Sequence, residues 1–500
     1  MLWLKINSVQ SGTTLVKRLD YEALGLNKSV KKTRCCKGNS VTSDSVTARL
    51  ADTTDLVQKP IGSYRATIGG RWENEMTAIA ERPHVVIAGA GFAGLYAARS
   101  LRTAPVRVTI VDRQNHHLFQ PLLYQVATAG LSAPDIASPI RGILRQQANT
   151  TVLLAEIEHV NPNHRCLVLD SGELAYDFLI LATGSTPNYF GHDEWAQHAP
   201  GLKNIQDAFE IRRRVLLAFE AAEREPDTEK QRAYLTFGIV GAGPTGAELA
   251  GILREIAQHT LARDFRNFDP RSTRVVLIDA AERVLPTFPE PLSQKARVML
   301  EALGVEIQTS SQVVDIDESG LTLTSTAPLA TAPERISART VLWAAGVKAS
   351  PLAESLNTPQ DEWGRVYVES DLSVPGYPEL FVVGDLAHVD RDDQPVPAMA
   401  PPAIQEGRHA ANVIQAVLRG HPRTSFHYKD RGMLAAIGRR AGVASIYGRS
   451  FSGLIAWFLW LVVHIASLIG FRNRLVVLFE WSWAYFTYQR SARVILSQMR

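Results

Sequence analysis

His84-Val-Val-Ile-Ala-Gly89-Ala-Gly91-Phe-Ala-Gly94 is the stretch of sequence that decides the fold. Its apolar run predicts a short buried strand, and its glycines predict a tight turn that opens a helix. A helix N-terminus offers free backbone N–H groups, and small residues let a pyrophosphate approach that backbone closely. We therefore expect a dinucleotide to bind at Gly89, Gly91, Phe92, Ala93 and Gly94.

The same design returns 152 residues further along the chain, where Thr236-Phe-Gly-Ile-Val precedes Gly241-Ala-Gly-Pro-Thr-Gly246. One such match alone is weak evidence, but two matches, each after its own apolar strand, imply two nucleotides held by one protein. The economical interpretation is a flavin that stays bound and a nicotinamide that comes and goes. The second set of expected binding residues is Gly241, Gly243, Pro244, Thr245 and Gly246.

An acidic residue ends the strand that follows each fingerprint. Asp112 ends the run 106–112 and Asp279 ends the run 274–279. A carboxylate at this point can accept hydrogen bonds from both ribose hydroxyls, although Asp112 could simply cap its strand. Asp279 would also repel a 2′-phosphate, which favours NADH over NADPH. Arg283 lies close enough in sequence to weaken that preference.

Three further strands end in small-residue turns that complete the expected architecture. The run 178–184 ends in Ala182-Thr183-Gly184, the run 339–346 ends in Ala345-Gly346, and the run 378–385 ends in Gly384-Asp385. The last carboxylate could bind the ribityl chain of a flavin. We predict an α/β protein with two Rossmann-like domains, the nicotinamide domain being inserted into a discontinuous flavin domain. The expected boundaries are 83–205 and 346–430 for the flavin domain, 206–345 for the nicotinamide domain and 431–500 for a C-terminal region.

Composition limits the remaining classes. A formal net charge of +3 over 500 residues gives no indication of nucleic-acid binding. The three cysteines, Cys35, Cys36 and Cys166, form neither a disulfide framework nor a zinc motif. Residues 1–80 are rich in Ser, Thr, Lys and Arg, which predicts a disordered leader or a stretch upstream of the true start. Met76 would be a sensible start, because it shortly precedes the first strand.

The C-terminal region is apolar and basic. Residues 451–471 contain no Lys, Arg, Asp or Glu, and a helix of that length would be about 30 Å long, enough to cross a bilayer. Trp457 and Trp460 lie inside this run, which favours a helix in the interface instead. The segment 475–496 is aromatic and includes Arg490 and Arg493, a composition that suits the anionic headgroup layer. From the residues alone, spanning and lying flat remain open.

The chain from Pro83 to Leu496 resembles the type II NADH:quinone oxidoreductases, which are single-subunit alternative NADH dehydrogenases. The motifs are His117-Leu-Phe-Gln-Pro-Leu-Leu-Tyr-Gln-Val-Ala-Thr128, Gly243-Pro-Thr-Gly-Ala-Glu-Leu-Ala-Gly251, Ala345-Gly-Val, Gly384-Asp385, Ala400-Pro-Pro-Ala-Ile-Gln-Glu-Gly407, Gly470-Phe-Arg-Asn-Arg474 and Trp481-Ser-Trp483. The resemblance implies that NADH gives a hydride to FAD and that two electrons then pass to a membrane quinone, ubiquinone or menaquinone, without proton pumping.

The resemblance also implies roles for particular residues. Glu248, in the second fingerprint helix, is expected near the nicotinamide and flavin, and Gln405 is expected to take part in quinone reduction. Gln120 belongs with the cofactor-binding residues, whereas His116 and His117 receive no role. The implied quinone pocket comprises Ala403, Ile404, Gln405, Glu406 and Gly407. A monotopic anchor on the cytoplasmic face of the cell inner membrane, in contact with the lipid surface, is implied as well, and a homodimer is left open.

Three alternatives share parts of this pattern. Sulfide:quinone oxidoreductases have the same architecture but need redox cysteines near the flavin, and the core offers Cys166 alone. Disulfide reductases need a close cysteine pair in the flavin domain, whereas Cys35 and Cys36 lie in the leader. A slowly reacting FAD- and NADH-binding sensor, of the apoptosis-inducing-factor type, would act through a protein partner. The quinone-type motif and the apolar C-terminus count against it.

Overall fold

The computed structural model describes residues 82–326, 332–391, 394–487 and 492–495. All of them belong to the unit Asn74–Arg500. The leader predicted for residues 1–80, the proposed start at Met76 and the pair Cys35-Cys36 lie outside the described residues.

A six-stranded sheet follows the first fingerprint, with the strand order β20-β21-β9-β1-β2-β5. Its strands pair in parallel except β20 with β21, and the central ones are buried, as their apolar sequences predict. Because β21 pairs with β9, residues on both sides of the second fingerprint complete one sheet. The strands are β1 (His84–Ala88), β2 (Arg107–Asp112), β5 (Thr150–Leu154), β9 (Phe178–Leu181), β20 (Ser373–Val374) and β21 (Tyr377–Val382).

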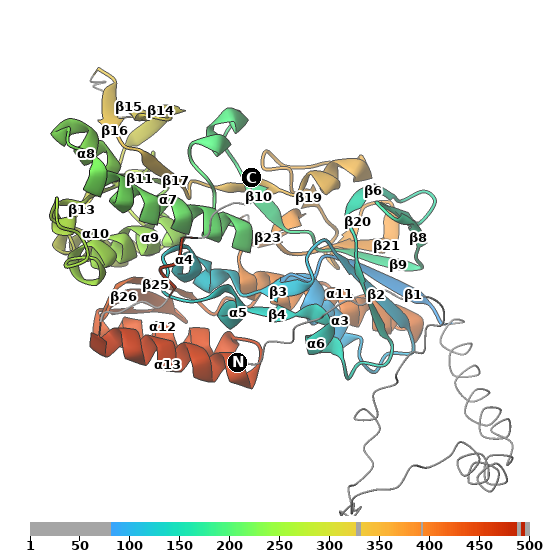
Figure 1. The fold of residues 1–500 in the computed structure, drawn as a ribbon. Coiled ribbons are helices and arrows are strands. Elements are labelled where there is room, and N and C mark those ends of the chain that lie inside the picture. The colour runs from blue at the N-terminus through green and yellow to red at the C-terminus, as the bar shows by residue number, and fades with distance from the viewer. Residues whose placement is uncertain (1–81, 327–331, 392–393, 488–491, 496–500) are drawn as a thin grey trace, which may run out of the picture. The chain divides into compact units, whose positions relative to one another are not determined.

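The second fingerprint begins a separate four-stranded parallel sheet with the order β13-β12-β11-β17. Figure 1 shows this sheet and its helices apart from the first sheet. The elements are β11 (Thr236–Val240), β12 (Arg274–Ile278), β13 (Val305–Gln308), β17 (Thr340–Trp343), α7 (Ile205–Arg224), α8 (Thr228–Tyr234), α9 (Pro244–Glu255) and α10 (Glu290–Ala302). A π-helical turn, Ile256–Thr260, continues α9. A small sheet of β14 (Ser311–Asp317), β15 (Gly320–Ser325) and β16 (Glu334–Ser337) extends this half.

The chain passes between the two sheets twice, and the two crossings pair with each other. β10 (Ser185–Pro187) leaves after β9, β18 (Val347–Ala349) returns after β17, and the two form an antiparallel ribbon. This pairing places the whole second sheet as an insertion into the first fold. The boundaries at 205/206, 345/346 and 430/431 stay predictions.

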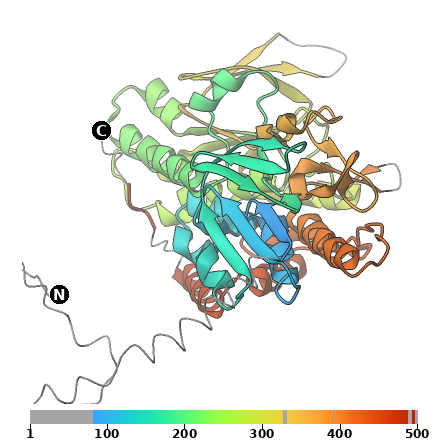
Figure 2. The same cartoon turned by 90° about the vertical axis from the view of Figure 1, so that its right-hand side faces the viewer.

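Smaller elements surround the first sheet (Figure 2). α3 (Phe92–Ser100) packs against α11 (Ala400–Leu418). The others are α4 (Leu123–Ala127), α5 (Ala133–Ile136), α6 (Ile140–Leu144), the sheet of β6 (Ile157–Asn161), β7 (Cys166–Leu169) and β8 (Gly172–Ala175), and the pairs β3 (His116–Leu118) with β4 (Ala137–Pro139), β19 (Val366–Tyr367) with β22 (Ala387–His388), and β23 (Asp390–Arg391) with β24 (Gln394–Pro395).

The C-terminal region is a three-stranded sheet followed by two helices that lie side by side in Figure 1. The elements are β25 (Met433–Gly438), β26 (Ala441–Ile446), β27 (Arg449–Ser452), α12 (Leu454–Ser467) and α13 (Phe471–Thr487). The apolar run 451–471 is therefore not one continuous helix. Leu468 is extended, and Gly470, at a φ of +91°, turns the chain into α13.

This break leaves α12 shorter than the helix of 21 residues that the spanning alternative assumes. The 14 residues of α12 extend over about 21 Å at 1.5 Å each, less than the roughly 30 Å of a bilayer core. Across the described ranges, none of the helices combines the length and apolar character that a membrane crossing requires.

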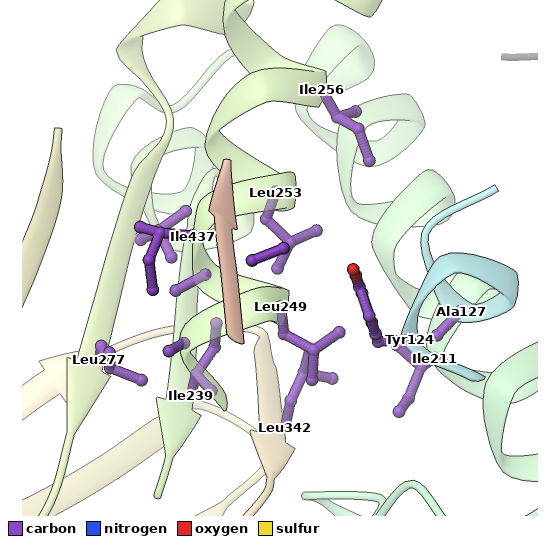
Figure 3. Packing of buried hydrophobic residues seen from close by; sticks show 14 of the residues in the cluster. Tyr124, Ala127, Ile211, Ile239, Leu249, Leu253, Ile256, Leu277, Leu342 and Ile437 are labelled. Carbon is purple, nitrogen blue, oxygen red and sulfur yellow. The ribbon is translucent and has the colours of Figure 1, made fainter. Parts of the chain in front are cut away.

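The largest hydrophobic cluster joins the second sheet to the C-terminal region. Figure 3 shows Leu249 and Leu253 of α9 between Leu277 of β12 and Tyr124 of α4, with Ile437 of β25 close by. Trp460 of α12 belongs to the same cluster. One side of the C-terminal region is thus fixed to the helix that carries the second fingerprint.

Candidate functional site

The first glycine turn has the close contacts that a dinucleotide turn requires. Gly89 has a φ of +98°, and a Cβ on it would lie 2.4 Å from the Ala182 carbonyl oxygen. A Cβ on Gly94 would lie 1.9 Å from the Gly89 carbonyl oxygen. A Cβ on Gly91, in contrast, would meet no described heavy atom within 4 Å. The turn is therefore tight toward the sheet and open where a phosphate would lie.

The second glycine turn repeats this geometry. Gly241 has a φ of +104° and abuts Ala344, while a Cβ on Gly246 would lie 1.8 Å from the Gly241 carbonyl oxygen. Gly243 is open in the same sense as Gly91. α9 begins at Pro244, which suits the first helical position because it lacks an N–H that would otherwise be unpaired. Pro244 and the adjacent Thr245 are exposed, so this helix start is accessible.

The two strand-ending acids hold the two turns in the same way. Asp112 Oδ2 accepts from the Ala90 amide at 2.7 Å, and Asp279 Oδ2 accepts from the Ala242 amide at 2.5 Å. Burial raises the pKa of Asp112, and the amides bonded to it oppose that rise. Both carboxylates therefore brace a glycine turn, and their contact with ribose stays a prediction.

The hydrogen bonds of Arg283 go to backbone carbonyl groups and not to Asp279. Its guanidinium donates to the carbonyl oxygens of Pro286, at 2.8 Å, and Phe288, at 3.1 Å. The residue that could have favoured a 2′-phosphate is thus bonded to its own loop.

Gly384 and Asp385 lie at the carboxyl end of β21, next to the first fingerprint. Asp385 Oδ2 accepts from the Ser185 hydroxyl at 2.5 Å, and Lys203 Nζ donates to that hydroxyl oxygen at 2.8 Å. The Gly384 amide donates to Glu406 Oε2 at 2.5 Å. The residues predicted to form the second half of the flavin site therefore contact β10 and α11.

Three of the residues predicted to line a quinone pocket on α11, Ala403, Glu406 and Gly407, contact Gly384 or the first fingerprint helix. Burial raises the pKa of Glu406 to about 8, Asp385 adds to the rise, and the Gly384 amide opposes it. A Cβ on Gly407 would lie 2.1 Å from the Ala93 carbonyl oxygen, so this glycine allows α11 to cross α3 closely. Ala403 is buried beside Gly384, whereas Ile404 is half-buried.

Gln405 is bound to the backbone ahead of the C-terminal sheet. Its Nε2 donates to the Lys429 carbonyl oxygen and its Oε1 accepts from the Lys429 amide, both at 3.0 Å. Gln120 likewise donates to a backbone carbonyl, that of Lys203, at 3.0 Å. Both amides join separate segments, and their predicted roles in catalysis and cofactor binding stay predictions.

Two buried polar atoms beside the first glycine turn make no hydrogen bond within the described residues: His117 Nε2 and Thr183 Oγ1. The other ring nitrogen of His117 lies 2.9 Å from the Ala90 carbonyl oxygen. Burial lowers the pKa of His117 to about 4, so the ring is neutral. Buried polar atoms normally have partners, and these two therefore fit a bound group at this turn. The sequence motif 117–128 pointed to the region, but not to His117 itself.

The structure also forms a cavity of about 360 Å³ that the sequence did not predict. It lies between α9, α4, the end of β25 and the two C-terminal helices. Its lining includes Leu478 and Phe486 of α13, whose exposed side chains bring its rim to the surface. The residues that line it are Tyr124, Gln125, Gly130, Glu248, Ile252, Glu255, Thr260, Ala436, Ile437, Gly438, Arg439, Trp457, Trp460, Leu461, Leu478, Trp481, Ser482, Ala484, Tyr485 and Phe486.

Glu248 lies at the buried side of this cavity. Its Oε1 accepts from the Ala436 amide at 3.2 Å. Burial raises its pKa to about 8, and the Ala436 amide and the Trp460 indole oppose the rise. The carboxyl group is therefore protonated at neutral pH and faces the C-terminal region.

Tryptophan rings form much of the cavity wall. Trp460 and Trp481 have ring centroids 5.1 Å apart, and the Trp481 indole N–H donates to Gln125 Oε1 at 2.7 Å. Trp457 packs against Tyr485 at 5.8 Å. The tryptophans of the apolar run therefore line a cavity and do not all face outward.

Comparisons with known proteins first define the class. A family described as "Pyridine nucleotide-disulphide oxidoreductase" matches residues 83–407, and one described as "NDH2 C-terminal domain" matches residues 431–489. The first match covers both glycine turns and Gly384-Asp385. The chain thus belongs to the class of pyridine nucleotide-disulphide oxidoreductases.

Individual relatives then define the family. The chain is 44% identical to "Type II NADH:quinone oxidoreductase Ndh" of Mycobacterium tuberculosis, over 85% of this chain and 93% of that protein. It is 43% identical to NdhA of the same organism, over 85% and 92%. The chain belongs to the type II NADH:quinone oxidoreductase family.

Solved structures agree in fold. NDH2 of Plasmodium falciparum, in complex with NADH, aligns with a TM-score of 0.76 at 19% identity, over 83% of this chain and 100% of that chain. The sulfide:quinone oxidoreductase of Aquifex aeolicus aligns with a TM-score of 0.63 at 16% identity, over 78% and 92%. Fold alone therefore does not separate these two activities.

Proposed function

We propose that the chain catalyses the oxidation of NADH by a membrane quinone, with FAD as its bound cofactor and without proton pumping. The observation that carries the proposal is the aromatic cavity that joins the second fingerprint helix to the C-terminal helices. One wall of the cavity is formed by α9, which carries the second fingerprint. The rim is formed in part by exposed apolar side chains of α13. A substrate confined to lipid needs such a path.

Bound FAD supplies the two-electron carrier between NADH and quinone. The chain would hold it at the first glycine turn, with Gly384-Asp385 beside that turn and with His117 Nε2 and Thr183 Oγ1 as unused hydrogen-bonding atoms. The chain would hold NADH at the second turn, with Asp279 selecting the free 2′-hydroxyl. The protein's main contribution is to place the two reactants and exclude water.

We place the quinone head group in the cavity. Trp457, Trp460 and Trp481 offer flat apolar faces, and the protonated Glu248 can donate a hydrogen bond to a quinone oxygen. Binding sites of this kind are largely apolar with a few convergent polar groups. Residues 403–407 do not line this cavity, and their assignment to the quinone pocket stays a prediction.

We further propose that α12 and α13 lie in the headgroup layer at the cytoplasmic face of the cell inner membrane. Phe458 is 57% exposed, Phe479 is 68% exposed and Phe486 is 80% exposed. Arg449, Arg472 and Arg474 are exposed near this apolar surface and can attract anionic lipid. Charge and exposed apolar area together suit an anchor that does not cross the bilayer.

The proposal is tested by NADH oxidation with the purified protein reconstituted in vesicles, with and without quinone and with NADPH in parallel. We expect rapid quinone-dependent oxidation of NADH, within the range of about 1–10³ per second usual for enzymes. A yellow protein that NADH bleaches and quinone does not reoxidise would favour the sensor of the apoptosis-inducing-factor type. A protein that binds no flavin would contradict the proposal.

The sulfide:quinone alternative depends on thiols. Within the described residues Cys166 is the free cysteine, and it lies buried in β7 of the small sheet β6-β7-β8, away from both glycine turns in sequence. Sulfide-dependent quinone reduction by the reconstituted protein would be the result that revives this alternative.

A further inference from the structure

α9 places two carboxylates in the same cavity. Glu255 follows Glu248 by seven residues, and both line the cavity. Seven residues are two helical turns, so the two side chains leave one face of α9 about 10 Å apart along its axis. Glu248 Oε1 accepts from the Ala436 amide at 3.2 Å, and Glu255 Oε1 accepts from the Arg439 amide at 2.5 Å.

The two carboxylates differ in their access to water. Glu248 is buried, whereas Glu255 is half-buried. Glu255 lies toward Arg439, whose guanidinium stacks on Tyr485 of α13. The cavity therefore has one carboxyl group deep inside and a second two turns away with contact to solvent.

The proposed function, on which this inference rests, consumes one proton from water in each turnover. NADH delivers a hydride, which is two electrons and one proton. Quinone needs two electrons and two protons to become quinol, so the balance is NADH + H⁺ + quinone = NAD⁺ + quinol. A quinone head group enclosed by the cavity walls therefore needs a group that carries this second proton to it from solvent.

We propose that Glu255 supplies this proton: it takes a proton from solvent and passes it through cavity water to Glu248, which gives it to a quinone oxygen. The volume of about 360 Å³ leaves room for a few waters at about 30 Å³ each beside a head group. The elevated pKa of Glu248 lets it regain a proton at neutral pH after each transfer.

The other titratable or charged side chains lining the cavity are Tyr124 of α4, Arg439 after β25 and Tyr485 of α13. An arginine does not release its proton in proteins. The Tyr124 hydroxyl accepts from Gln125 Nε2 at 3.2 Å, and the Tyr485 hydroxyl accepts from Arg440 Nε. The lining residues from α12 and from the π-helical turn are Trp457, Trp460, Leu461 and Thr260. Among the described lining residues, the two glutamates are thus the carboxyl groups.

The test uses Glu255→Gln in the full-length, FAD-loaded protein reconstituted with quinone. Glutamine still accepts from the Arg439 amide but cannot carry a proton. We expect NADH:quinone turnover at saturating quinone to fall at least tenfold relative to NADH:ferricyanide turnover, which takes up no proton. The KM for quinone should change less than twofold, and the loss should grow as pH rises above 7.

Three measurements separate proton supply from a merely structural role. Glu255→Asp should recover most of the turnover, and imidazole added at millimolar concentration should partly rescue Glu255→Gln. Glu220→Gln, an exposed change on α7, is the matched control and should behave as the wild type. FAD content and melting temperature confirm that each variant folds.

Each remaining outcome overturns a specific claim. Wild-type quinone turnover in Glu255→Gln would refute the proton role. A loss that imidazole does not rescue, with a raised KM for quinone, would show that Glu255 shapes the cavity and would refute the inference as well. A wild-type protein that does not oxidise NADH with quinone would overturn the proposed function and this inference with it.

Discussion

We predict that the choice between NADH and NADPH depends on Asp279. Its Oδ2 braces the second glycine turn through the Ala242 amide, so it combines a structural role with the predicted contact to ribose. Asp279→Asn keeps an oxygen for that amide and removes the charge that repels a 2′-phosphate. We expect the ratio of kcat/KM for NADH to that for NADPH to fall at least tenfold.

The equivalent residue of the first turn supplies the control. Asp112→Asn should weaken FAD retention during gel filtration without altering the nicotinamide preference, because it braces the other turn. An unchanged NADH preference in Asp279→Asn would remove the assigned role.

Glu406 makes the stability of the folded protein depend on pH. Its pKa is about 8 in the folded protein and 4.5 by its ordinary value. Between these values the folded chain keeps a proton that the unfolded chain loses, so stability falls as pH rises from about 4.5 to 8. Glu406→Gln has no proton to lose, and its amide oxygen can still accept from Gly384.

We therefore expect the drop in melting temperature between pH 6 and pH 8 to be smaller in Glu406→Gln than in the wild type. Calorimetry of the FAD-loaded proteins at both values checks this. Part of the drop should persist, because burial shifts the pKa of Glu248 in the same direction. An identical drop in both proteins would show that Glu406 is not the protonated group.

At the scale of elements, local patterns were predictable and long-range pairings were not. The strand at 84–88 and the acid Asp112 at the end of the next strand are predictable from the sequence. Both depend on apolar runs and glycine turns, which involve residues close together in the chain. The pairing of β10 with β18 joins segments far apart in sequence, and Glu248 meets Ala436 across 188 residues. No local pattern encodes such a contact, so the cavity itself was missed.

The break between α12 and α13 is indicated in the sequence by a glycine, which the apolar composition of the run does not reveal. Gly470 lies near the end of the apolar run 451–471, and a glycine just after a helix commonly ends it. The absence of charged residues over 451–471 therefore does not by itself indicate one continuous helix. The structure ends α12 at Ser467 and starts α13 at Phe471.

The exposed faces of α12 and α13 predict how the protein binds lipid. Phe458 and Phe479 are both exposed, one on each helix. Burying a phenylalanine in an apolar environment contributes about 1.5–3 kcal/mol. The double variant Phe458→Glu/Phe479→Glu should therefore bind anionic vesicles at least tenfold more weakly in a sedimentation assay.

Val298→Glu is the control for this change, since Val298 is exposed on α10, in the nicotinamide half. Its vesicle binding should match the wild type. NADH oxidation by ferricyanide, which requires no lipid, should survive in the double variant. Undiminished vesicle binding would assign the membrane contact to another surface.

At the scale of the whole molecule, both halves of the flavin fold depend on one bound group. The first glycine turn and Gly384 come from segments separated by the entire inserted domain, and β21 with β9 joins them. A ligand that binds only the folded state stabilises it in proportion to the logarithm of its concentration over Kd. Removing FAD should lower the melting temperature, and adding it back should restore the original value.

Differential scanning calorimetry of stripped and reloaded protein measures this effect, with added NADH as a comparison. We place the nicotinamide at the second glycine turn, whose sheet comes from one continuous segment, so we expect a smaller rise from NADH than from FAD. Equal melting temperatures with and without FAD would contradict the assignment of the first turn to FAD.

The rim of the cavity, formed in part by Leu478 and Phe486, opens among the side chains proposed to enter lipid. For a substrate that arrives by that route, the concentration that matters is the amount of quinone per lipid and not the amount per litre of solution. Diluting the vesicles with buffer that contains the same concentration of NADH then leaves the reaction rate per enzyme unchanged, whereas adding empty lipid that mixes with them slows it. The enzyme would in effect respond to the composition of a two-dimensional solution, and any change in the lipid content of a cell would alter its rate without a change in the protein.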